Sequence, residues 1–155
     1  MLESVAHTFW DLHFQYVEQF LVALLPMAVT VAIHGEGMQL AGRHFNRHGR
    51  RPAAGSSAGP HVIVLITIVA IMLAAHFSEV FAWAFFYLAT DMISDFRTAM
   101  FYSVESYTTL GASNFDLPGR WQGLGGLEAM TAMLMFGWST AVLAVILQKS
   151  HGIEA

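Results

Sequence analysis

The chain has 155 residues, of which 55% are hydrophobic and 12% charged, and its mean hydropathy is +0.53. These proportions are typical of integral membrane proteins, and the small net charge of -4 gives no reason to expect a nucleic-acid partner. Cysteine is absent, which excludes disulfides, thiolate metal sites and cysteine nucleophiles and leaves histidine as the soft ligand. The mixed, acidic start MLESVAHTFWDLH is not typical of a signal peptide.

Three stretches are long and apolar enough to cross a bilayer as helices, which takes about 20 residues each. They are residues 14–33, 62–89 and 126–147. Pro26 lies inside the first stretch, where a membrane helix tolerates it if neighbouring groups satisfy the freed carbonyl. The sequence therefore predicts an all-α integral membrane protein with three transmembrane helices.

The connection between the first two stretches is basic. It contains no acidic residue and holds four of the seven Lys and Arg residues: Arg43, Arg47, Arg50 and Arg51. Basic loops stay on the cytoplasmic side, so we expect the N-terminus outside and the C-terminus in the cytoplasm of a cell inner (plasma) membrane. The chain then divides into a first helix with its leading segment (1–41), a basic cytoplasmic loop (42–61) and a remaining part (62–155).

The segment between the second and third stretches is too polar for hydrocarbon. Its helix-compatible part, DFRTAMFYSVESY, begins at Asp95, whose side chain we expect to cap the helix. The following TTLGASNFDLPGRWQGLGG is rich in glycine and small residues. Irregular backbone at membrane depth is tolerated only where protein buries it or where it lines a water-filled cavity. The pattern therefore predicts a re-entrant pore helix and filter loop.

The stretch YSVESYTTLG resembles the pore helix and filter entrance of potassium channels, most closely the inward rectifiers and their bacterial relatives. The family pattern is S-[IV]-E-T-x-[TA]-T-[VI]-G-Y-G. The residues that match it in register are Ser103, Val104, Glu105, Thr108, Thr109 and Gly111. The resemblance covers residues 62–147 as a two-helix pore module, with the first helix as an addition. It implies a homotetramer in the lipid bilayer that conducts K⁺ or Na⁺ passively, without enzymatic activity or a cofactor.

The resemblance also implies which residues form the filter: Thr108, Thr109, Leu110, Gly111, Ala112 and Ser113. Backbone carbonyls there replace the hydration shell of an ion when four copies surround one axis. They point inward only if alternate residues take left-handed dihedrals, which cost a residue with a Cβ about 1 kcal/mol or more. Where the family has G-Y-G-D, this chain reads Gly111, Ala112, Ser113 and Asn114. We therefore expect a non-standard filter with weak potassium selectivity.

Charged groups within a membrane are costly, so those near the filter are candidate supports. The candidates are Glu105, Asn114, Glu79 and Glu128. In inward rectifiers the glutamate that matches Glu105 pairs with an arginine just after the filter, for which Arg97 and Arg120 are the nearest substitutes here. The three glutamates are either protonated or hydrogen-bonded buttresses, or a gate that senses protons or cations.

Gly137 is the candidate in the third stretch for the glycine at which the family's inner helix bends. The alternative is that it allows close helix packing.

A second hypothesis, from another class of protein, rests on histidine. His76 and Glu79 are three residues apart and share a helix face, and His34 ends the first stretch. Histidines on two helices are potential ligands of a metal or a haem. The alternative function is therefore a small membrane haem or metal-binding protein that uses intramembrane His and Glu. The channel hypothesis itself assigns no resident metal, and a haem pocket would not explain the TTLG loop.

Overall fold

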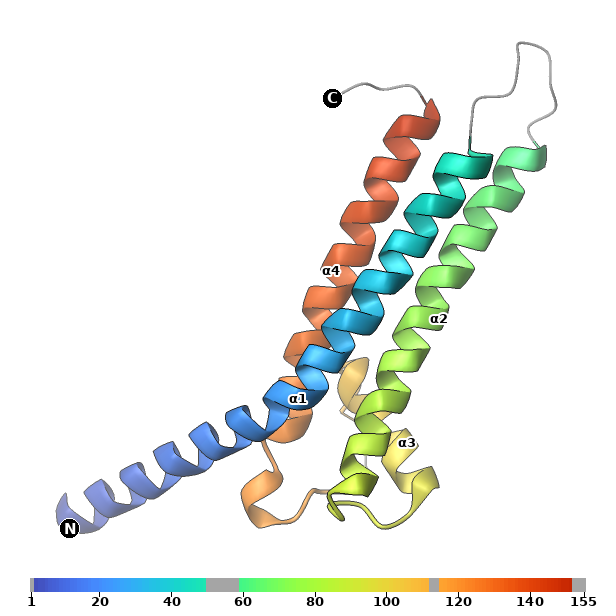
Figure 1. The fold of residues 1–155 in the computed structure, drawn as a ribbon. Coiled ribbons are helices and arrows are strands. Elements are labelled where there is room, and N and C mark those ends of the chain that lie inside the picture. Colours follow the sequence, from blue (N-terminus) through green and yellow to red (C-terminus); the bar gives the residue numbers. More distant parts are fainter. Residues whose placement is uncertain (1, 50–58, 112–114, 152–155) are drawn as a thin grey trace. The chain divides into compact units, whose positions relative to one another are not determined.

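The computed structural model describes residues 2–49, 59–111 and 115–151, and within these ranges every regular element is a helix (Figure 1). The elements are α1 (Leu2–His48), α2 (Gly59–Ala89), α3 (Phe96–Tyr107), the short 3-10 helix η1 (Gly119–Trp121) and α4 (Leu124–His151). The chain forms two compact units. Unit 1 comprises Met1–Thr30 and Val80–Met133, and unit 2 comprises Val31–Glu79 and Leu134–Ala155.

Three segments are long and apolar enough to cross a membrane. They are His13–His48, Val62–Ala89 and Gly119–Ser150, and each contains an 18-residue window that is strongly apolar, with mean hydropathies of 1.8, 2.2 and 1.9. The predicted all-helical fold is confirmed for the described residues, and three helices of this length and composition fit the predicted multi-pass membrane protein. A further helix, α3, lies between the second and third segments, where the sequence predicts it.

Helix α1 is longer than the predicted span of residues 14–33. It continues through Pro26 and does not end until His48, so it includes part of the segment expected to be a loop. At 1.5 Å per residue its 47 residues extend about 70 Å along the helix, more than twice the roughly 30 Å of a hydrocarbon core. Only part of α1 can therefore lie in hydrocarbon.

Tertiary packing accounts for the extra length of α1 despite its glycines. Met38, Ala41 and Phe45 recur at intervals of three and four residues and are all buried in the core of unit 2. Gly37 permits a close approach to α2, because a Cβ at this position would lie 2.7 Å from the Cβ of Ala75. A helix that buries such a face remains stable through residues that are poor helix formers.

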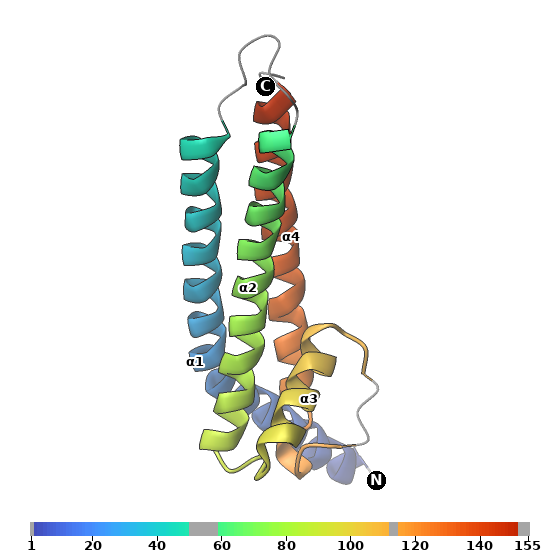
Figure 2. The same ribbon diagram turned by 90° about the vertical axis from the view of Figure 1, so that its right-hand side faces the viewer.

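Unit 2 consists of the later part of α1, the earlier part of α2 and the later part of α4, which lie side by side (Figures 1 and 2). The end of α1, the start of α2 and the end of α4 lie at the same end of this unit. Its core residues are Met38, Ala41, Phe45, Val64, Ile68, Met72 and Ile146. These apolar contacts hold the three helix segments together.

Unit 1 positions α3 against the other helices. Its core joins Ala23 of α1, Trp83 and Tyr87 of α2, Tyr102 of α3 and Leu124 of α4. The rings of Tyr87 and Tyr102 meet edge to face, with centroids 5.2 Å apart. Helix α3 is therefore an integral part of unit 1 (Figure 2).

Many large apolar side chains face away from the core of their unit. Phe85, Leu134 and Leu25, for example, are 71%, 70% and 68% exposed. So many exposed large apolar side chains are unusual for a water-soluble monomer. It fits contact with lipid or with other copies of the chain.

Candidate functional site

Helix α3 begins as predicted. A side-chain oxygen of Asp95 accepts hydrogen bonds from the backbone N–H of Thr98 at 2.8 Å and from the Thr98 hydroxyl at 2.9 Å. The backbone hydrogen bond is the main reason why the pKa of Asp95 is lowered. The predicted N-terminal cap is therefore confirmed.

The end of α3 has an unusual backbone. Thr109 and Gly111 both have a φ of 60°. The Leu110 N–H donates to the Glu105 carbonyl at 2.9 Å and the Thr109 N–H to the Ser106 carbonyl at 3.1 Å, which is the pattern of a Schellman cap. Glycine usually occupies the left-handed position of such a cap, whereas Thr109 is β-branched and strained there. Such strain persists only where the surroundings over-determine it.

The described part of the predicted filter, Thr108 to Gly111, follows α3 directly and is exposed on unit 1. Leu110 is 69% exposed. Ala112, Ser113 and Asn114, which carry the departures from the family pattern, lie outside the described residues. The structure thus describes the first four of the six predicted filter residues.

A buried hydrogen-bonded cluster braces α3 against α2 and α4. Tyr87 donates to Oε2 of Glu128 at 2.8 Å, and Ser103 Oγ lies 2.5 Å from Glu128 Oε1 and 2.9 Å from the Val80 carbonyl oxygen. All three side chains are fully buried. The Ser103 hydroxyl has one hydrogen, so it donates to one of these two oxygens at a time. Glu128 has the geometry of a hydrogen-bonded buttress.

Glu105 lies on the side of α3 that lines a pocket of about 360 Å³, together with Tyr102, Ser106 and Thr109. Its Oε2 atom is buried and has no hydrogen-bond partner among the described residues. An unpaired buried carboxylate oxygen is costly. A hydrogen-bond partner for Glu105 Oε2 would have to come from outside the described part of this chain.

The two arginines expected as partners of Glu105 lie elsewhere. Arg120 is 3.6 Å from a carboxylate oxygen of Glu18 and stacks over the ring of Trp121 at 4.7 Å. Arg97 lies over the Phe101 ring at 5.8 Å. Among the described residues neither arginine forms a salt bridge with Glu105.

Gly137 has open space around it. A Cβ built there meets no atom within 4 Å among the described residues. Close helix packing at Gly137 therefore has no partner within the described part of the chain, and a hinge role stays a prediction.

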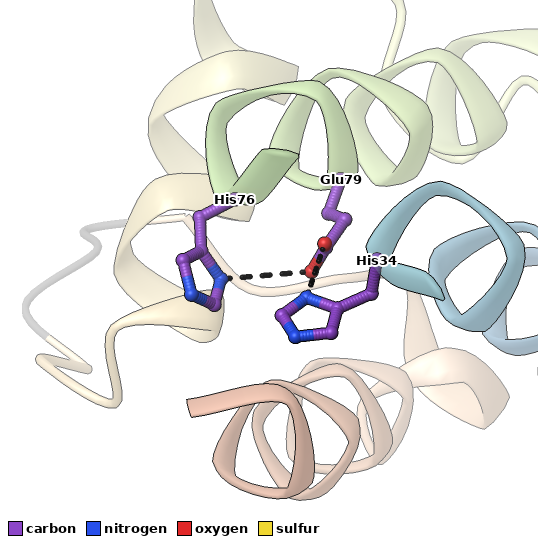
Figure 3. Close-up of side chains that lie close together, drawn as sticks. All are labelled: His34, His76 and Glu79. Carbon is purple, nitrogen blue, oxygen red and sulfur yellow. Dashed lines mark hydrogen bonds and ion pairs between the residues drawn. The ribbon is translucent and has the colours of Figure 1, made fainter. Parts of the chain in front are cut away.

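A second cluster lies in unit 2, where His34 on α1 and His76 and Glu79 on α2 point toward one another (Figure 3). His34 Nδ1 is 2.8 Å from Glu79 Oε1, and His76 Nδ1 is 3.7 Å from Glu79 Oε2. The side chains of His34 and Glu79 are fully buried, and that of His76 is 12% exposed. The expectation that His76 and Glu79 share a helix face is confirmed. The metal or haem hypothesis named His34 together with this pair, and the structure brings the three side chains together.

Ser139 on α4 completes this cluster, although the sequence analysis did not single it out. Its Oγ lies 3.1 Å from His76 Nε2 and 3.3 Å from His34 Nε2, and it donates to Met38 Sδ at 3.8 Å. The available signal was a small polar residue within an apolar helix, because such side chains often hydrogen-bond across helices in membranes.

Comparisons of the chain with models of protein families, with curated proteins and with solved structures found no match. The likeness to potassium channels therefore rests on the residues of YSVESYTTLG alone.

Proposed function

We propose that the chain is one subunit of a homotetrameric, potassium-channel-like cation channel that conducts K⁺ or Na⁺ passively. In this proposal α3 is a re-entrant pore helix, and Thr108–Gly111, followed by Ala112 and Ser113, line the central axis. The observation that carries the proposal is the pair of left-handed residues, Thr109 and Gly111, directly after a short capped helix between two helices of membrane length. Alternating left-handed residues are what a filter lined by carbonyls requires.

The exposure of this segment supports a tetramer. In one chain the strained Thr109 and the apolar Leu110 both face away from the core. Four copies around an axis would cover these residues and supply the surroundings that a strained backbone needs. One loop per chain supplies one quarter of such a filter.

The bracing of α3 supports the same proposal. A filter needs a fixed backbone, and fixed sites depend on supporting hydrogen bonds and packing. Ser103 on α3 contacts both Val80 of α2 and Glu128 of α4, and Tyr87 holds Glu128 in place. Glu79 was also predicted to support the filter. Its carboxylate contacts His34 in unit 2, so this proposal does not include Glu79 among the filter supports.

The proposed orientation places the basic end of unit 2 in the cytoplasm of a cell inner membrane. Arg43 and Arg47 lie near the end of α1 and Lys149 near the end of α4, at the same end of this unit (Figure 1). Positive residues concentrate on the cytoplasmic side of membrane proteins. The N-terminus is then outside, and the C-terminus is in the cytoplasm.

A second candidate function, a membrane metal-binding protein, is favoured by the cluster of His34, His76 and Glu79. The Nε2 atoms of both histidines lie within hydrogen-bond distance of Ser139, and both Nδ1 atoms face Glu79. This arrangement favours a small ion over a haem, because a porphyrin would have to displace these contacts.

Cation flux into liposomes that contain the purified protein tests the channel proposal. Wild type is expected to pass K⁺ and Na⁺ well above the level of empty liposomes. Thr109→Val keeps the branched side chain but removes the hydroxyl, and it should reduce flux. Thr109→Ser keeps the hydroxyl and serves as the matched control. No flux by correctly folded wild type, or equal flux by the three proteins, would overturn the assignment of Thr109.

A further inference from the structure

The cluster of His34, His76 and Glu79 brings three potential ligand atoms to one place in unit 2. We infer that these residues bind a divalent transition-metal ion of the zinc class. One ligand atom from each residue lies within 4.8 Å of the others. The inference does not depend on the channel proposal, since it concerns a different unit of the chain and is read out by metal binding alone.

Ser139 Oγ lies within hydrogen-bond distance of Nε2 of both imidazole rings, 3.1 Å from His76 and 3.3 Å from His34. A serine hydroxyl has one hydrogen and two lone pairs. A metal ion on the two Nδ1 atoms would leave the hydrogen of each neutral ring on Nε2, and the Ser139 oxygen, with its own hydrogen directed to Met38 Sδ, is placed to accept from both. Histidine ligands of metals characteristically donate their other ring N–H in this way, which fixes the tautomer and the orientation of the ring. Both Nδ1 atoms are thereby directed toward Glu79.

A cation is the natural complement of this arrangement. With both rings in that tautomer, two Nδ1 lone pairs and the Glu79 carboxylate face one another, and a bound cation relieves the repulsion between them. The surroundings are apolar, because the ring of Trp138 lies 5.2 Å from that of His34 and the ring of Phe136 4.6 Å from that of His76. In such surroundings the attraction between a bound cation and these ligands is stronger than in water.

The ligand set and its dimensions fit zinc. Two imidazole nitrogens and one carboxylate oxygen form a common zinc site with a fourth position left open. Ligand atoms about 2.0–2.1 Å from a tetrahedral zinc lie roughly 3.3 Å from one another. The distances from Glu79 oxygens to Nδ1 of His34 and His76, 2.8 Å and 3.7 Å, lie on either side of this value. Small side-chain adjustments would therefore complete the site.

Binding of Co²⁺ provides a direct test, because a tetrahedral Co²⁺ site absorbs visible light and zinc displaces the cobalt. The full-length protein, purified without a histidine tag and stripped with a chelator, is titrated with Co²⁺ and then with Zn²⁺. Wild type is expected to bind one ion per chain, with absorption that zinc removes. His76→Gln alters the ligand that is least buried and should weaken binding at least about 100-fold.

Two further variants make the test specific. The His44→Gln/His48→Gln double variant removes two histidines one turn apart on α1, outside the cluster, whose ring centroids lie 4.6 Å apart, and it should bind as wild type does. Ser139→Ala keeps all three ligands and should weaken binding by about 10- to 100-fold. The inference is overturned if wild-type protein of native helical content does not bind metal stoichiometrically. Hydrogen bonds alone would then join His34, His76 and Glu79. The inference is equally overturned if the double variant loses binding while His76→Gln keeps it.

Discussion

Ser103→Ala removes the hydroxyl that joins α3 to both of its neighbouring helices. In the folded protein Ser103 Oγ lies 2.9 Å from the Val80 carbonyl oxygen and 2.5 Å from Glu128 Oε1, and no part of Ser103 is exposed. The substitution leaves a buried carboxyl oxygen without this partner, which costs about 1–3 kcal/mol. The free energy of unfolding is therefore expected to fall by about 1–3 kcal/mol.

Unfolding in mixed micelles with an increasing fraction of sodium dodecyl sulfate, followed by far-ultraviolet circular dichroism, measures this loss. Ser78→Ala is the matched control, because the exposed Ser78 hydroxyl donates only within its own helix, to the Ala74 carbonyl. The control should change stability by no more than about 0.5 kcal/mol. If Ser103→Ala unfolds together with Ser78→Ala, the cluster does not brace α3.

A double-mutant cycle shows whether Ser103 acts through Glu128. Glutamine has nearly the shape of a protonated glutamate, so Glu128→Gln alone should cost less than Ser103→Ala. Because the two side chains are in contact, the double variant is expected to depart from additivity by at least about 0.5 kcal/mol. Strict additivity would mean that the two residues do not interact as described.

Four further results are expected. Gly37→Ala should destabilise unit 2 by about 1–3 kcal/mol in the same unfolding assay, because its Cβ would meet α2 at 2.7 Å, whereas Gly42→Ala meets no atom within 4 Å and should not. The folded-state pKa of Asp95 is lowered from 3.8, so its contribution to stability is complete above that pH and is lost as the pH falls through the lower folded value; Asp95→Asn should abolish this dependence in acid unfolding curves. Glu105→Gln should keep the oligomer intact in native electrophoresis, since no arginine of the described chain pairs with it, and loss of the oligomer would point to an arginine of another copy. An impermeant thiol reagent applied to whole cells should not label a cysteine placed at Ser57, and labelling there would reverse the proposed orientation.

The elements that depend on local sequence could be predicted. Hydropathy and length located the three long helices, because a bilayer imposes the same requirement on any spanning segment. The start of α3 was predictable because the Asp95 cap depends on residues only three apart in the sequence.

The elements that depend on tertiary packing could not be predicted in the same way. The first span was predicted to end at residue 33 and the loop to begin at residue 42, but burial of Met38, Ala41 and Phe45 carries the helix on to His48. The meeting of His34 with Glu79 depends on how two helices are rotated and aligned, which hydropathy does not record. Ser139 was missed for the same reason.

The number of subunits tests the central claim most directly, because a filter with one loop per chain needs four chains. Native mass spectrometry of the protein released from lipid nanodiscs gives this number without assuming any activity. The account predicts a complex of four copies of the 17.1 kDa chain. A monomer or a dimer as the largest stable species would contradict the proposed pore.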